Sequence, residues 1–247
     1  MSAKSYQPAL RTAAVWLTFA SSAAIVVGIA PSQILLGAAL ACLLASGEKP
    51  QIPAAIKFPL GLFLLGTLVA VALSGDIAGG WPQVKKMYVF LQLVVAYTLL
   101  RETKMARWLV LCWGAFGAGS ALLGVGQFAV KLYRIHRAGE DFYSGYVAQR
   151  ITGFMSHWYT FSVEEMLVLL MLGSFVFFSP AARRHLWLWC TLAALMSLGV
   201  VLAETRAVWI ALVIGAAYLV WCWRKWVVLV IPTLVLIGLL VAPQAIR

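Results

Sequence analysis

Long runs of apolar residues alternate with short polar links along the whole chain. A helix that crosses a membrane needs roughly 20 mostly apolar residues, whereas barrel strands alternate apolar and polar residues over about ten. The runs here are continuous and rich in Leu, Ala and Gly. They predict an all-α fold, a polytopic transmembrane helix bundle of about nine spans in a single transmembrane domain over 1–247. The expected spans are about 12–30, 33–46, 56–74, 84–100, 108–130, 158–178, 186–203, 207–222 and 226–242.

Two links between these runs are very short. The link at Pro31 is tight, so we expect the first two spans to form a helical hairpin. Only Glu204, Thr205 and Arg206 separate the seventh and eighth spans. A continuous helix over 186–222 would be about 55 Å long, well beyond a hydrocarbon core of about 30 Å. The chain must therefore turn at these three residues.

Composition excludes a soluble domain. Apolar residues make up 63% of the 247 residues and charged residues 11%, and the mean hydropathy is +0.93. Soluble domains are near half apolar and a quarter charged. The net charge of +11 is scattered in short clusters between spans, so no nucleic-acid partner is expected. The four cysteines lie far apart inside apolar runs and predict neither a disulfide nor a metal site; no cofactor is expected.

The positions of the basic residues predict the orientation of the chain, because cytoplasmic links carry more Lys and Arg. With a cytoplasmic N-terminus, eleven of the 19 basic residues face inward and eight face outward. We therefore expect a multi-pass protein whose N-terminus is cytoplasmic and whose C-terminus is outside. The outward set is Lys85, Lys86, Lys131, Arg134, Arg137, Arg150, Arg206 and Arg247.

Lys85 and Lys86 follow Pro82, a residue that suits the first turn of a helix. Two lysines near a helix N-terminus destabilise the helix unless an anion is bound there. Free backbone N–H groups beside lysines form a phosphate site. Contact with anionic lipid headgroups is an equally good interpretation.

The longest link, about 131–157, carries several basic and aromatic residues. Tyr133, Phe142, Tyr143 and Tyr146 are typical of a membrane interface, so this link is either an interfacial amphipathic segment or a loop that binds a charged amphiphile. His157 stands at the outer end of the sixth span, where a hydrogen-bonded interfacial role is the more common one for a histidine.

Charged residues near the spans are functional candidates, because ionisable groups are costly inside a membrane. Arg206 and Glu204 stand at the turn, and only a broken helix could pair them. Glu164 and Glu165 lie in the sixth span. Because they are adjacent, they cannot share one helix face, and at least one should face the bundle interior or the outer aqueous edge.

Two segments resemble the O-antigen ligase and O-antigen polymerase family. RITGFMSHWYTF (150–161) is similar to that family's R-x-x-G-x-x-x-H-x-x-T/N-x stretch, and ETRAVWIAL (204–212) is similar to its later T/S-R-x-x-W-L/I motif. The order of the motifs and the multispan context extend the resemblance over about 12–242.

The resemblance implies a metal-independent inverting membrane glycosyltransferase of lipopolysaccharide biosynthesis. It would act at the outer face of the bacterial inner (plasma) membrane, taking a glycan from undecaprenyl diphosphate and passing it to a sugar hydroxyl on another glycan or on lipid A core. By resemblance, Arg150 and Arg206 bind the diphosphate, since arginine forks suit phosphate oxygens. The helix-terminus argument adds Lys85 and Lys86 to this site. His157 and Glu204 are candidates for residues that contact the diphosphate ligands without binding the diphosphate themselves.

Departures from the family pattern limit what the resemblance implies. The family's large outer loop, with the histidine that acts as general base, should begin where the chain reaches 242–247. The base is therefore left unassigned, and we expect this chain to bind the lipid-linked donor without transferring its glycan. A non-catalytic accessory membrane subunit, or a polyprenyl-lipid-binding protein, is the alternative.

Overall fold

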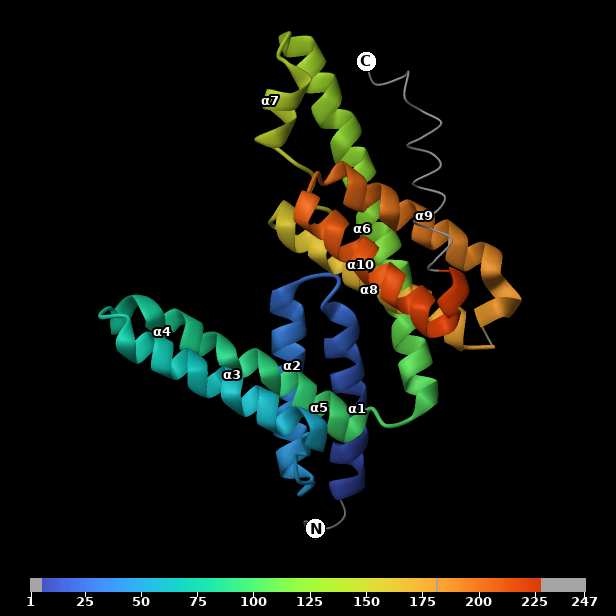
Figure 1. Ribbon diagram of the computed structural model, residues 1–247. Coiled ribbons are helices and arrows are strands. Elements are labelled where there is room, and N and C mark those ends of the chain that lie inside the picture. The colour runs from blue at the N-terminus through green and yellow to red at the C-terminus, as the bar shows by residue number, and fades with distance from the viewer. Residues whose placement is uncertain (1–5, 181, 228–247) are drawn as a thin grey trace. The chain divides into compact units, whose positions relative to one another are not determined.

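The computed structural model describes residues 6–180 and 182–227, the side chain of Arg183 excepted, and these residues form helices without any strand (Figure 1). The chain divides into two compact units, Met1–Leu109 and Val110–Arg247. The first contains α1 (Gln7–Ala24), α2 (Ile29–Ala45), α3 (Ala54–Leu73), α4 (Ile77–Lys85), the 3-10 helix η2 (Lys86–Phe90) and α5 (Leu91–Leu99). Helix α6 (Thr103–Ala138) leads into the second, followed by α7 (Phe142–Val147), α8 (Trp158–Phe178), the 3-10 helix η3 (Ala182–His185), α9 (Leu186–Leu202) and α10 (Arg206–Trp223).

The expected all-helical architecture is confirmed for the described residues, and a helical segment lies at each of the first eight expected spans. Four helices, α3, α6, α8 and α10, are long and apolar enough to cross a membrane, and α2 and α9 are shorter apolar helices. These helices indicate a membrane protein. The ninth expected span, 226–242, lies almost entirely outside the described residues, and the number of spans stays a prediction.

The core of the first unit lies between α1, α2 and α5. Helices α1 and α2 form the expected hairpin, and α5 packs against both. Inside it, Ser21 Oγ lies 2.8 Å from the Ser32 carbonyl oxygen and 2.9 Å from Gln92 Oε1. Gln92 Nε2 in turn donates to Ser22 Oγ at 2.7 Å. Each of these buried polar groups therefore has a partner, as native interiors require.

A second hairpin, of α3 and the helical run 77–99, carries the apolar surface of the first unit. Figure 1 shows α3 and α4 side by side. Helix α3 has the highest mean hydropathy of the four candidate spans, 2.1, and none of its residues is buried. Such a surface suits lipid or another apolar environment.

Small residues on α6 allow the second unit to pack tightly. A Cβ added at Gly114 would lie 2.8 Å from Leu172 Cδ1 of α8, and one at Gly199 of α9 would lie 3.1 Å from Ala121 Cβ of α6. Such small residues let membrane helices approach closely. Helix α8 also packs against α9 and α10. Helix α6 runs to Ala138, beyond the expected end at 130, so the first part of the 131–157 link is helical.

Candidate functional site

The segment that follows α7 is held against α6 by side chains that sequence analysis missed. Gln127 Oε1 accepts hydrogen bonds from the backbone N–H groups of Thr152 (2.9 Å) and Gly153 (3.1 Å), and its Nε2 donates to the Gly153 carbonyl at 3.1 Å. Ser120 Oγ accepts from the Phe154 N–H at 3.1 Å. A glutamine inside an apolar run was the available signal, since a polar side chain there needs partners.

Gly153, the glycine of the first motif, is required by its surroundings. Its φ of 55° lies in the left-handed region, which L-residues other than Gly rarely adopt. A Cβ at this position would also lie 2.4 Å from Ser120 Oγ and 2.5 Å from the Phe161 ring. Both the backbone angle and the close approach to α6 and α8 therefore need glycine here.

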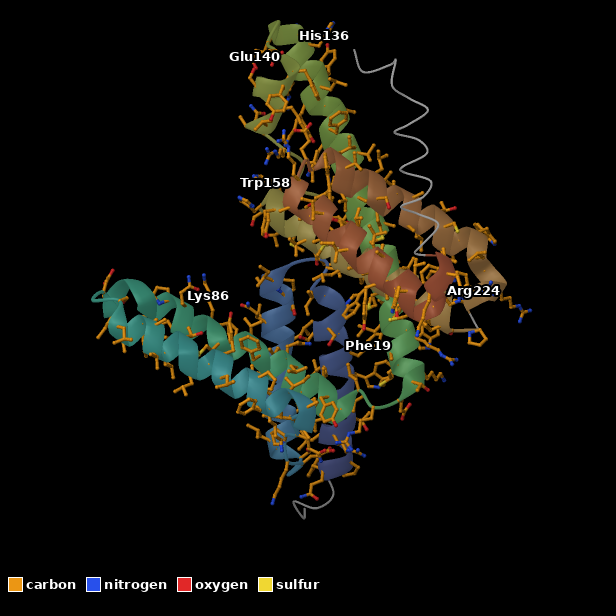
Figure 2. All side chains as sticks on the ribbon, in the orientation of Figure 1. Phe19, Lys86, His136, Glu140, Trp158 and Arg224 are labelled. Carbon is orange, nitrogen blue, oxygen red and sulfur yellow. The ribbon has the colours of Figure 1, made fainter. Side chains whose placement is uncertain are left out.

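Arg150 lies at the start of the segment between α7 and α8, and its guanidinium forms no ion pair with a described acidic residue. Its guanidinium carbon is 4.4 Å from the centroid of the Trp158 ring, a cation–π distance. Figure 2 shows Trp158 at the start of α8. The Nε atom of Arg150 is buried and has no hydrogen-bond partner among the residues that the structure describes. Lys131 Nζ donates to the Arg150 backbone carbonyl at 2.8 Å, which ties the start of the segment to α6; the cation that acts electrostatically on Lys131 is Arg134.

The predicted break between α9 and α10 is confirmed. Helix α9 ends at Leu202, α10 begins at Arg206, and Glu204 between them has a φ of 48°. Side chains satisfy two of the last carbonyls of α9, which lack partners within the helix. The Tyr146 hydroxyl donates to the Leu202 carbonyl, and Trp209 Nε1 donates to that of Val200 at 3.0 Å. The tryptophan of the second motif thus joins α10 to α9.

Helix α7 connects the two arginine-bearing segments. Arg206 is exposed, and its Nη2 lies 3.4 Å from the Tyr143 hydroxyl. Burial raises the pKa of Tyr146 to about 12; the charge of Glu204 adds to this rise and that of Arg150 opposes it. Both charges therefore lie within electrostatic reach of one hydroxyl. The structure brings the segments of Arg150 and Arg206 to the same end of the second unit.

Two expectations about this end need correction, and a third agrees with the structure. Tyr146, expected at the membrane interface, is 1% exposed because its ring stacks on Phe142 and packs edge-on against Phe128. The possible pair of Glu204 with Arg206 is not formed, as no ion pair joins them within 6–180 and 182–227. His157 caps α8, its Nδ1 accepting from the Tyr159 N–H at 3.1 Å, which is the structural role expected of it.

The argument that placed Lys85 and Lys86 at a helix N-terminus is wrong. Helix α4 begins at Ile77, where the Asp76 carboxylate accepts from the Gly79 N–H at 2.8 Å, and Pro82 lies inside it. Lys85 is its last residue, and the next residues continue as η2. Both lysines are exposed (Figure 2 labels Lys86) and belong to the first unit. Their role in anion binding stays a prediction without the helix-terminus argument.

Comparison of the chain with protein-family models, with curated proteins and with solved structures found no match.

Proposed function

We propose that this protein is a membrane glycosyltransferase of the O-antigen ligase or polymerase type, which takes a glycan from undecaprenyl diphosphate at the outer face of the bacterial inner membrane. The observation that carries the proposal is the meeting of the Arg150 and Arg206 segments through α7. These segments also hold the two motifs that resemble the family.

The charges at this end suit a lipid diphosphate. Arg150, Arg206 and Lys131 form no ion pair with an acidic residue in the described part of the chain. A diphosphate brings two or three negative charges and many acceptor oxygens, and the arginine fork donates to such oxygens in pairs. The buried Nε–H of Arg150 has no acceptor among the described residues. A buried donor without an acceptor destabilises the folded state, so a phosphate oxygen that accepts from it would bind favourably.

The arginines would assist the reaction by stabilising charge on the departing group. In glycan transfer, the bond between the sugar anomeric carbon and the diphosphate oxygen breaks while the acceptor hydroxyl oxygen forms a bond to that carbon. The hydroxyl proton passes to a general base, which is not assigned to a residue of this chain. The diphosphate leaves with the bonding electron pair, and a guanidinium held in place stabilises the developing charge. Trp158 and Tyr143 contact the guanidinium groups of Arg150 and Arg206 and so limit their motion.

Donor binding by single variants tests the proposal. The purified chain in vesicles would be titrated with an undecaprenyl-diphosphate glycan, beside Arg150→Gln, Arg206→Gln and the control Arg137→Gln. Arg137 is an exposed cation in the last turn of α6, in the same region of the chain. Each site variant should weaken binding by about 1–3 kcal/mol, the scale of charge-assisted hydrogen bonds. Equal affinity of all four proteins would contradict the proposal.

A non-catalytic role, as an accessory subunit or a polyprenyl-lipid binder, is the second candidate. It is favoured by the cap at His157, whose Nδ1 is engaged by the Tyr159 N–H, so that one of its two ring nitrogens is not free to act as a general base. Donor binding without transfer is expected of the enzyme reading as well, so binding itself separates the two. No donor binding by the chain with wild-type Arg150 and Arg206 would support the accessory subunit over the enzyme.

A further inference from the structure

A carboxyl group lies deep in the helix packing of the second unit. Glu165 of α8 is 1% exposed, and its Oε2 atom has no hydrogen-bond partner among the described residues. A Cβ added at Gly117 of α6 would lie 3.3 Å from Oε2 and 2.8 Å from Met196 Cε of α9. The carboxyl group therefore sits between three helices, against the backbone of α6 and a thioether methyl group.

A second unpartnered oxygen lies on the same face of α8. Ser162 precedes Glu165 by one helical turn and is fully buried, and its hydroxyl also finds no partner within the described ranges. Residues three apart on a helix are neighbours. Buried polar atoms are nearly always hydrogen-bonded, so exceptions such as these need an explanation. A serine hydroxyl can donate to a carboxylate or accept from a carboxylic acid, so it can serve either state of Glu165.

We propose that Glu165 is a proton-binding site inside the membrane-embedded bundle. Gly117 of α6 and Met196 of α9 lie beside it and carry no titratable atom. Helix α10 also packs against α8, yet the charged group that acts on Glu165 is Glu164 of its own helix. Glu164 can only add repulsion. An ionised carboxylate without a cation in such surroundings is strongly disfavoured. One carboxyl and one hydroxyl also offer too few oxygens for a hard metal cation, which takes six or more.

The site lies close to the basic end of the unit along both α8 and α6. Glu165 follows Trp158, the first residue of α8, by seven residues, or about 10 Å along the helix. Ser162 lies between them. On α6, Ser120 is one turn from Gly117 and binds the Phe154 N–H in the Arg150 segment. Protons would therefore reach Glu165 from the end of the unit that carries Arg150. This inference does not depend on the proposed glycosyltransferase activity.

Reaction with dicyclohexylcarbodiimide tests the proposal, because this apolar reagent modifies protonated carboxyl groups in apolar surroundings. The full chain would be treated in vesicles of phosphatidylethanolamine and phosphatidylglycerol, and the modified residue identified by mass spectrometry of its peptides. We expect modification at Glu165, and none at position 165 in Glu165→Gln. Modification at Glu165 should persist in Glu164→Gln, the matched control. Its rate should fall as the pH rises, approaching about tenfold per pH unit once the ionised form predominates.

Several results would overturn the assignment. Modification confined to Glu164, a rate independent of pH, or no modification of the folded chain would each show that Glu165 does not hold an exchangeable proton. Protection by sodium ions at constant pH would assign the site to a cation instead. Infrared spectra provide a check that does not depend on reagent access. Because Glu164 also has a buried, unpartnered oxygen, the comparison is made without it: the carbonyl band of a protonated acid should be present in Glu164→Gln and missing from the double variant Glu164→Gln, Glu165→Gln.

Discussion

The two units both contain buried polar residues, but they treat them differently. In the first unit, Ser21, Ser32 and Gln92 satisfy one another across α1, α2 and α5. In the second, Ser162 and Glu165 are as deeply buried, yet Ser162 Oγ and Glu165 Oε2 find no partner in the described part of the chain. Complete networks stabilise one packing of helices, whereas unsatisfied groups cost stability. Ser120 and Gln127 of the second unit are partnered like the polar groups of the first, so the difference singles out Ser162 and Glu165 as the buried polar groups that do not serve the fold.

The largest effect is expected at the tightest point of the second unit. Gly153→Ala forces a Cβ into contact with Ser120 and Phe161 at a left-handed backbone position. We expect a loss of about 2–5 kcal/mol from strain and overpacking together, and loss of donor binding with it. Thermal unfolding in detergent measures the first. Gly126→Ala, where an added Cβ meets nothing within 4 Å, is the control and should unfold no earlier than wild type.

The next largest effect on stability is expected when the hydrogen-bond network of the first unit is broken. Gln92→Leu removes one hydrogen-bond partner from Ser21 and one from Ser22 while keeping the side chain similar in size. The lost hydrogen bonds should cost about 1–3 kcal/mol, seen as a lower unfolding temperature. Donor binding should not change if this network serves only the fold. An unchanged unfolding temperature would mean that the network contributes nothing.

A smaller effect is expected where α7 meets the end of α9. Tyr146→Phe removes the hydroxyl that donates to the Leu202 carbonyl, and should cost about 1 kcal/mol. Because burial raises the pKa of Tyr146 to about 12, the folded state holds this proton more tightly than the unfolded state. Stability should therefore fall as the pH rises from about 10 towards 12. Urea titrations of both proteins over that range should show a steeper fall for wild type than for Tyr146→Phe.

The smallest effect on stability, expected at Ser162, tests the difference between the two units most directly. Ser162→Ala removes a buried hydroxyl with no partner in the described residues, so the unfolding temperature should stay the same or rise slightly. Ser21→Ala, the matched change in the first unit, should lower it, because the Ser32 carbonyl and Gln92 Oε1 each lose a hydrogen bond. Equal losses for the two variants would show that the hydroxyls are not treated differently.

Sequence patterns predicted the helices well and the connections poorly. Continuous apolar runs placed the helices, and the length argument located the turn at 204–206, because both follow from the thickness of a membrane. The role of Pro82 was misjudged, since the cap at Asp76 outweighs the preference of proline for a first turn. The burial of Tyr146 depends on Phe128 and Phe142, which are brought to it by the fold rather than by spacing in the sequence.

The candidate site was predictable only in part. The two motifs identified Arg150 and Arg206, but no sequence pattern indicated that α7 would join their segments through Tyr143 and Tyr146. Gln127 was visible as a polar residue in an apolar run, yet its three bonds to residues 152 and 153 are long-range contacts. The suggestion that one of the adjacent glutamates faces the interior is confirmed by Glu165.

The central claim is that Arg150 and Arg206 bind the same diphosphate, and a double-mutant cycle tests it most directly. Donor affinity would be measured for wild type, Arg150→Gln, Arg206→Gln and the double variant in the same vesicles. If both guanidinium groups contact one diphosphate, their losses should not add, and the coupling should be about 0.5–3 kcal/mol. Losses that add within about 0.3–0.5 kcal/mol would mean that the two arginines act at separate places and would contradict the claim.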